Sequence, residues 1–373
     1  MHPNVSVDIP VHMGTLATRS SQRRSIQGYA HGSRSTLSSH KPPRRGWCKR
    51  LFEKCARVLH ESSLLFSAAV TTFRTLQRVG VNLTPNHFYW PVPDLAELEK
   101  SEWPTYPYPS GCSFRLREQN ELAGEFSKLY APECQFDSQT IEGSYHYGNG
   151  YFESCDAEVA YCMVRRWKPS RIVEIGSGYS SRILATALRA NIAKDGIAGE
   201  LITVDPSPER LPSDGLSDVA TVIAAPVQHL DMSLFSSLQP DDVLFIDSSH
   251  VVSVGSDVVH EFLQILPKLR PGVLVHMHDI FLPLEYPREA VLKNLWFWSE
   301  QYLLQAFLSF NTHFEVLWSA SAMQSEYPDV LEQCFPRWKH SYRDIPEVKR
   351  SFIPTIDHDH VWPSSFWMRR VQA

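Results

Sequence analysis

Two short runs of acids, serines and histidines carry the side chains best suited to chemistry. The first run is Asp-Ser-Ser-His, from Asp247 to His250, and the second is His278 with Asp279. An imidazole titrates near neutral pH, so His250 and His278 are candidate general bases that remove a proton from a hydroxyl group. Each histidine also has a plainer interpretation, as a hydrogen-bonded structural group at the end of a strand.

The same two runs predict a second kind of chemistry. If Asp247 and Asp279 end neighbouring strands, their carboxylates converge and could hold one divalent ion such as Mg²⁺ or Mn²⁺. Such an ion would bind the hydroxyl oxygen of a substrate. His250 or His278 could complete the ligand set, which would favour the softer ion. The sequence leaves the metal and the metal-free alternatives open.

A glycine turn lies upstream of these residues. An apolar run at 172–175 ends in Gly176-Ser-Gly178, and a helical pattern starts at Ser180. A strand that passes through glycines into a helix lets the backbone approach a nucleotide closely. Ser181 stands where a dinucleotide fingerprint needs its third glycine. Asp205 ends the next apolar run and is expected to bond ribose hydroxyls, or else to cap the following turn.

Apolar runs that alternate with helical patterns are expected to position these residues. Seven runs predict strands, at residues 172–175, 201–205, 220–224, 242–247, 272–279, 314–318 and 365–369. Helical patterns are expected at residues 51–79, 156–167, 258–266, 295–310 and 329–335. This order predicts an α/β fold, a Rossmann-like doubly wound sheet of about seven strands, mostly parallel with an antiparallel last strand. The carboxyl ends of its parallel strands would gather the candidate residues at one edge.

Four motifs make the chain similar to class I S-adenosylmethionine-dependent methyltransferases. They are Glu-Ile-Gly-Ser-Gly, Val-Asp-Pro, Phe-Ile-Asp-Ser-Ser-His and His-Asp-Ile-Phe-Leu-Pro. More narrowly, they resemble a bacterial branch of uncharacterised small-molecule or glycan methyltransferases, over residues 149–370. The resemblance implies S-adenosylmethionine as cofactor and methyl transfer as the reaction. From their places at the glycine turn and the strand ends, we expect the cofactor to bind at Glu174, Gly176, Ser177, Gly178, Tyr179, Ser180, Asp205 and Asp247, and we expect His250, His278 and Asp279 to act in catalysis.

The metal remains open within this resemblance. Metal-dependent O-methyltransferases carry an Asp after the fourth strand and an Asp-Asn pair after the fifth. Ile280 stands where that Asn would be, which removes one oxygen ligand and leaves Asp247 and Asp279 as candidate metal ligands.

Composition suggests three segments. Residues 1–45 are basic and poor in apolar periodicity, and we expect a disordered extension, with organelle targeting or a basic interaction arm as alternatives. Residues 46–148 are expected to hold a helix and a segment rich in aromatic residues and proline, which is either a packed linker or an acceptor wall. Residues 149–373 are expected to form the methyltransferase domain, with a long insertion at about 319–363.

Charge and cysteine content limit which binding partners and which cellular compartment the sequence predicts. Beyond residue 50 the chain holds 27 basic and 40 acidic residues, which argues against a nucleic-acid channel. No apolar run is long enough to span a membrane. Seven cysteines without a Cys-x-x-Cys pair fit a reducing, cytoplasmic environment.

The function expected from these features is O-methylation of a hydroxyl on a small molecule or sugar. Two other classes are weighed against it. A nicotinamide-dependent oxidoreductase would need the third glycine. A cofactor-binding protein without catalysis would have no use for the two histidines and two acids.

Overall fold

The computed structural model describes residues 63–84, 90–103, 111–137, 143–208, 216, 218–351 and 353–372. The chain divides into two units, Met1–Leu83 and Thr84–Ala373. The described part of the first unit contains the helix α2 (Ser63–Arg78). The extension expected at residues 1–45, and the start of the helix expected at 51–79, lie outside the described residues. The expected boundary near residue 148 falls within the second unit, and that division of the chain stays a prediction.

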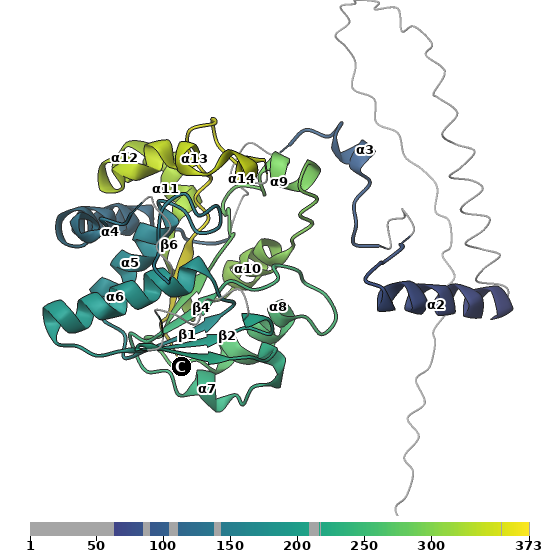
Figure 1. Ribbon diagram of the computed structural model, residues 1–373, viewed down its shortest axis with the longest axis horizontal. Coiled ribbons are helices and arrows are strands. Elements are labelled where there is room, and N and C mark those ends of the chain that lie inside the picture. The colour runs from purple at the N-terminus through teal and green to yellow at the C-terminus, as the bar shows by residue number, and fades with distance from the viewer. Residues whose placement is uncertain are drawn as a thin grey trace, which may run out of the picture. The chain divides into compact units, whose positions relative to one another are not determined.

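The second unit is built on a seven-stranded sheet in the order β3-β2-β1-β4-β5-β7-β6 (Figure 1). The strands are β1 (Arg171–Ile175), β2 (Glu200–Val204), β3 (Ala220–Ile223), β4 (Val243–Ile246), β5 (Leu274–Met277), β6 (Phe314–Ser319) and β7 (Phe366–Arg370). The first five strands pair in parallel, and β7 runs antiparallel to both β5 and β6. This confirms the predicted Rossmann-like α/β fold with its antiparallel last strand.

Helices cover both faces of the sheet, as its apolar strands require. The helices of the second unit are α3 (Leu95–Leu98), α4 (Leu116–Leu129), η1 (Ala131–Glu133), α5 (Asp156–Trp167), α6 (Tyr179–Asp195), η3 (Val227–His229), α7 (Ser233–Ser236), α8 (Asp257–His260), η4 (Glu261–Ile265), η5 (Leu266–Lys268), α9 (Arg288–Leu292), α10 (Glu300–Ser309), α11 (Ala320–Glu326), α12 (Pro328–Cys334), η6 (Pro336–His340), α13 (Ser341–Asp344) and α14 (Glu347–Arg350).

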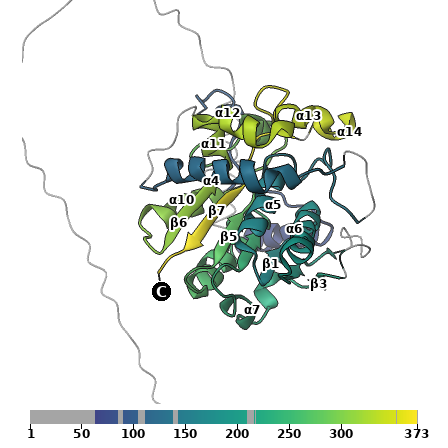
Figure 2. The ribbon, with the colours of Figure 1, turned by 90° about the vertical axis from the view of Figure 1, so that its left-hand side faces the viewer.

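Each face of the sheet has its own core. Ile172 and Phe245 pack with α4, α5 and α6, which lie in front of the sheet in Figure 2. Val173 and Ile246 pack on the opposite face, with α8, η4 and α10. Alternate residues of a strand point to opposite faces, so one apolar run supplies both cores.

Two expected helices differ from the structure. The helix predicted at 295–310 begins only at Glu300. Leu295 has a φ of +59°, in the left-handed region, and Ser299, directly before the helix, has a φ of −144°, so neither residue is helical. The helix predicted at 258–266 is composite: α8 continues as the π-helical turn η4 and then as the short 3₁₀ helix η5, which carries a proline near its start. A π-helical turn inside a helix often accompanies a functional site.

The segment between β6 and β7 contains α11 to α14, yet the two strands still pair directly. The end of this segment contacts a glycine-rich loop before α5. A Cβ atom at Gly148 would overlap the carbonyl oxygen of Asp344. Lys349 donates from Nζ to the carbonyl oxygen of Asn149 at 2.7 Å, and its ammonium lies 5.0 Å from the ring centroid of Tyr151. The 148–151 loop is therefore braced by residues about 200 positions later.

Two further observations concern the described residues only. No helix among them is long and apolar enough to cross a membrane. The cysteines at positions 134, 155, 162 and 334 carry free thiols.

Candidate active site

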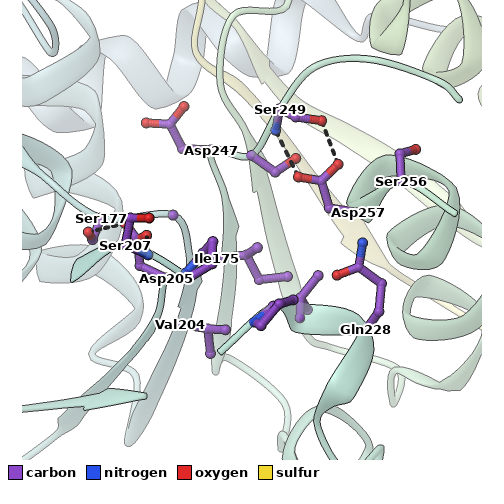
Figure 3. A pocket seen from close by; sticks show the side chains of 15 residues that line it. Ile175, Ser177, Val204, Asp205, Ser207, Gln228, Asp247, Ser249, Ser256 and Asp257 are labelled. Atoms are coloured by element: carbon purple, nitrogen blue, oxygen red, sulfur yellow. Dashed lines mark hydrogen bonds between the residues drawn. The ribbon is translucent and has the colours of Figure 1, made fainter. Parts of the chain in front are cut away.

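A pocket of about 590 Å³ opens at the carboxyl ends of β1, β2 and β4 (Figure 3). Four of the predicted cofactor residues line it: Gly176, Ser177, Asp205 and Asp247. Parallel strands bring their carboxyl ends to the same edge, so residues far apart in the chain meet here. A volume of this size fits a drug-sized ligand or a nucleoside derivative.

The first glycine of the turn is required by the backbone. Gly176 has a φ of +94°, and a Cβ atom there would overlap the carbonyl oxygen of Asp247 on the neighbouring strand. A Cβ atom at Gly178 would meet no atom within 4 Å, so that side of the turn faces open space. Gly176 therefore allows close packing of β1 on β4, while Gly178 leaves room beside the turn.

Asp205 caps the turn that follows it and also lines the pocket, and its contact with a ribose stays a prediction. Its carboxylate accepts a hydrogen bond from the backbone N–H of Ser207 at 2.7 Å, as a turn-capping residue does, and another from the hydroxyl of Ser177. It also lines the pocket beside Ser177. These bonds fix the direction of its carboxylate toward the glycine turn.

Glu174 lies beneath the turn rather than in the pocket lining. Its side chain is fully buried, and Oε2 accepts hydrogen bonds from Ser181 at 2.6 Å and from Thr203 at 2.8 Å. The Ser181 hydroxyl in turn accepts from the backbone N–H of Gly178 at 3.1 Å. Burial raises the pKa of Glu174 to about 7, although these hydroxyls lower it. Glu174 thus contacts the turn through Ser181.

Three more predicted cofactor residues also lie outside the pocket lining: Gly178, and Tyr179 and Ser180 at the start of α6. Ser180 is buried. The Tyr179 ring stacks on Tyr151 with 6.0 Å between centroids, and the guanidinium of Arg182 lies 4.6 Å from it.

The second group of predicted residues meets at the ends of β4 and β5, which are adjacent in the sheet. Nε2 of His250 lies 3.5 Å from Oδ1 of Asp247 and 3.5 Å from Oδ2 of Asp279. Nε2 of His278 lies 3.8 Å from Oδ1 of Asp279. The structure therefore brings all four residues together, and Asp247 joins this cluster to the cofactor pocket.

The backbone of the cluster is unusual. His250 and Asp279 have φ values of +60° and +55°, a region that residues with a Cβ rarely adopt. Residues held in such conformations often belong to functional sites. Here the conformation turns two side chains from neighbouring strand ends toward each other.

Carboxylates dominate the electrostatics of the cluster. Burial alone would lower the pKa of His250, but interactions with Asp247, Glu300 and Asp279 outweigh burial and hold this pKa well above 6.5. Burial likewise lowers the pKa of His278, and the nearby carboxylates, Asp279 first, raise it above 6.5. Both imidazoles therefore hold a proton more tightly than a free imidazole does.

The cluster also fits a divalent cation. One ligand atom from each of Asp247, His250 and Asp279 can be chosen so that all three lie within 4.8 Å of one another. Atoms that share one ion, with bonds near 2.1 Å, lie roughly 3–4 Å apart. The distances of 3.5 Å from Nε2 of His250 to Asp247 and to Asp279 fall in this range. Two carboxylates and one imidazole suit Mn²⁺ or Mg²⁺ better than thiolate-seeking ions. The side chain of Ile280 is buried in the apolar core and supplies no ligand atom.

Three residues that the sequence did not single out contact the cluster. Glu300, at the start of α10, lies with Oε2 2.9 Å from Nδ1 of His250. Trp298 packs on the His250 ring, with centroids 4.7 Å apart. Ser364 donates from Oγ to Asp279 at 3.2 Å, and its backbone N–H donates to the buried Asp156 at 2.9 Å. None belongs to a motif near the cluster, so no local signal could reveal them.

Comparisons with known proteins show the family to which the chain belongs. Residues 173–280 match the family described as "Methyltransferase domain". An uncharacterised protein from Archaeoglobus fulgidus is 30% identical over 174 residues, which cover 44% of this chain and 76% of that protein. The chain therefore belongs to this family, in the class I S-adenosylmethionine-dependent methyltransferases, which confirms the class that its motifs indicated. The bacterial small-molecule or glycan branch stays a prediction.

Solved structures show weaker likeness. The O-methyltransferase from Bacillus cereus in complex with SAH is 14% identical, with a TM-score of 0.33, and the match covers 68% of this chain and 91% of that chain. The SAH-bound methyltransferase PaMTH1 from Podospora anserina is 17% identical, with a TM-score of 0.32, and the match covers 60% and 87%.

Proposed function

We propose that this protein transfers a methyl group from S-adenosylmethionine to a hydroxyl group of a small molecule or sugar. The observation that carries the proposal is the double position of Asp247, which lines the pocket and also contacts His250. A cofactor in the pocket would thus lie directly beside groups that bind and deprotonate a hydroxyl.

The cofactor would occupy the pocket with its ribose against Asp205. The carboxylate of Asp205 is already directed by Ser177 and Ser207, and its remaining lone pairs could accept from ribose hydroxyls. The open side of Gly178 would leave space for the rest of the cofactor near the start of α6. Glu174 would support the turn from below through Ser181.

Methyl transfer from a sulfonium is an in-line displacement, so the protein must orient the acceptor oxygen and receive its proton. Without a metal, Nε2 of His250, which faces the two carboxylates, is the better placed proton acceptor, and it must be unprotonated to act. Alternatively, Asp247, Asp279 and His250 would hold a divalent ion, which would supply Lewis-acid polarisation of the hydroxyl oxygen. Nε2 would then be a ligand, and the proton would pass to His278 instead.

Aromatic residues next to His250 would bind the body of the acceptor. Trp298 and Trp103 pack on a small apolar cluster around Phe281 and Tyr286. Trp298 also stacks on Trp296, with 4.4 Å between ring centroids. Aromatic faces bind flat rings and the apolar faces of sugars. Trp103 comes from the segment expected to form an acceptor wall, which supports that alternative over a simple linker.

A methyl-transfer assay tests the proposal. The full chain is incubated with labelled S-adenosylmethionine and a series of hydroxylated sugars and phenols, with and without a chelator. Asp205→Ala and His250→Ala serve as controls for the cofactor and acceptor sides. Failure of every acceptor, together with no detectable binding of S-adenosylhomocysteine by calorimetry, would reject the proposal.

A further inference from the structure

His250 is held in place by the first turn of α10. Its carbonyl oxygen accepts hydrogen bonds from the backbone N–H groups of Ser299 at 2.9 Å and Glu300 at 3.2 Å. The Ser299 hydroxyl accepts from the backbone N–H of Val252 at 2.8 Å. These contacts attach the loop after β4, with its left-handed residue at His250, to the start of a helix fifty residues later.

The side chain of Glu300 completes this attachment. It is 1% exposed, and Oε2 lies 2.9 Å from Nδ1 of His250, while Oε1 has no hydrogen-bond partner within the described part of the chain. Taking a carboxylate out of water costs several kcal/mol unless it is paired. Burial raises the pKa of Glu300, and the charges of Asp247 and Asp257 raise it further, whereas His250 lowers it. The interaction with His250 thus offsets the free-energy cost of burying the Glu300 carboxylate.

The opposite edge of the imidazole faces the reaction side of the site. Nε2 points toward Asp247 and Asp279, whose side chains are 29% and 24% exposed. Trp298 covers one face of the ring. A half-turn of the ring about its bond to Cβ would put carbon Cε1 where Nε2 now stands, and would break the bond to Glu300. The bond between Nδ1 and Glu300 therefore opposes this rotation.

We propose that Glu300 is a positioning residue that fixes the ring of His250 so that Nε2 faces Asp247 and Asp279. This inference rests on the proposed function, in which Nε2 meets the acceptor hydroxyl or a bound cation. A carboxylate that accepts a hydrogen bond from the second ring nitrogen of a functional imidazole sets the orientation of the ring. Loss of such a partner commonly lowers activity or metal affinity about 10- to 100-fold.

A comparison of Glu300→Ala, Glu300→Gln and His250→Ala tests the proposal. Glu300→Ala should lower kcat about 10- to 100-fold. Glu300→Gln keeps an oxygen that can accept from Nδ1 and should recover part of that loss. The affinity for S-adenosylhomocysteine should stay unchanged in both variants. The double variant Glu300→Ala/His250→Ala should be no slower than His250→Ala, because Glu300 acts only through that ring.

A matched control and a spectroscopic readout separate positioning from stability. Glu133→Gln removes another largely buried carboxylate, which binds Arg165 and Tyr161 away from the cluster, and should lower the melting temperature without lowering kcat. In proton NMR of the full chain, an imidazole N–H bonded to a carboxylate should give a downfield, slowly exchanging signal. This signal should vanish in His250→Ala and Glu300→Ala.

The outcomes are distinct. Persistence of the NMR signal in Glu300→Ala, or a double variant much slower than His250→Ala, would overturn the positioning role. If no acceptor is methylated, the signal still reports the contact between Glu300 and His250, so the proposed function can fail separately.

Discussion

His250 and Asp279 leave the ends of two adjacent parallel strands, both in the left-handed backbone region, and meet with Nε2 and Oδ2 3.5 Å apart. Two improbable backbone conformations that serve one contact suggest a site under functional constraint rather than a chance ion pair. We therefore expect substitutions at these positions to alter chemistry more than folding.

His250→Ala should slow methyl transfer by about 10²–10⁴-fold, the usual range for loss of a general base. His278→Ala should have a smaller effect, because His278 packs on Phe152 with 4.8 Å between ring centroids and reaches only one of the two carboxylates. Single-turnover kinetics with a saturating cofactor measures both. Equal losses, or a larger loss for His278, would reverse this assignment of roles.

Asp205→Ala should weaken binding of S-adenosylhomocysteine by roughly 1–3 kcal/mol, since ribose hydroxyls lose a charged acceptor. Asp205→Asn is the matched control, because it keeps an oxygen for the Ser207 N–H and so preserves the turn. Isothermal titration calorimetry gives both affinities. Wild-type affinity in the alanine variant would remove Asp205 from the cofactor site.

Both glycines of the turn should resist substitution, for partly different reasons. Gly176→Ala should destabilise the fold by at least about 1–2 kcal/mol, because of its positive φ, with a further cost from overlap with the Asp247 carbonyl. Gly178→Val should also destabilise the fold, by about 1–3 kcal/mol, because its φ of +158° is one that residues with a Cβ rarely adopt. Its side chain would meet no atom within 4 Å, and the folded variant should lose cofactor binding. Thermal unfolding and calorimetry measure both effects, and wild-type affinity for S-adenosylhomocysteine in Gly178→Val would contradict the assignment.

Stability should depend on pH through Glu174. Its pKa of about 7 in the folded protein exceeds the ordinary value of 4.5, so the folded state binds the extra proton. The stabilisation from this group is complete below pH 4.5 and is lost as pH rises through 7, by roughly 3 kcal/mol in all. Glu174→Gln cannot ionise, so its melting temperature should rise relative to the wild type between pH 5 and 8. A difference that stays constant with pH would show that Glu174 is ionised in the fold.

A divalent ion should bind only when both carboxylates of the cluster are present. Mn²⁺ titration by calorimetry should show one site in the wild type, which Asp247→Asn and Asp279→Asn each abolish. Asp257→Asn, which changes a pocket acid outside the cluster, should retain the site. Absence of Mn²⁺ binding to the wild type would favour a metal-free mechanism with His250 alone.

The fold was largely predictable because its signals are local. Most strands are apolar runs with a glycine, a proline or an acid next to one end, and the alternation with helices implies the parallel sheet. Helix boundaries were less predictable. The apolar stretch from Leu295 looks helical in sequence, but Leu295 and Ser299 both have non-helical backbone angles, and α10 begins only at Glu300.

The site was predictable only where its residues follow the strands. The order of the strands places the carboxyl ends of β4 and β5 side by side. The residues that follow these two strands therefore meet: Asp247, His250, His278 and Asp279. Glu300 could not be found in this way, because its partner lies fifty positions earlier and its environment is created by tertiary packing. The supporting position of Glu174 was also hidden, since the alternation of a strand sets the face of a residue but not its hydrogen-bond partners.

The bracing of the 148–151 loop has a consequence for exchanging acceptor specificity between relatives. Gly148 admits no side chain because of the Asp344 carbonyl, and Lys349 binds the loop backbone at Asn149. The loop and the α13–α14 segment therefore form one module split between two distant stretches of sequence. Grafting either stretch alone into a relative would lose the contacts between them, beside Tyr151 and Tyr179. Grafting both together would keep these contacts.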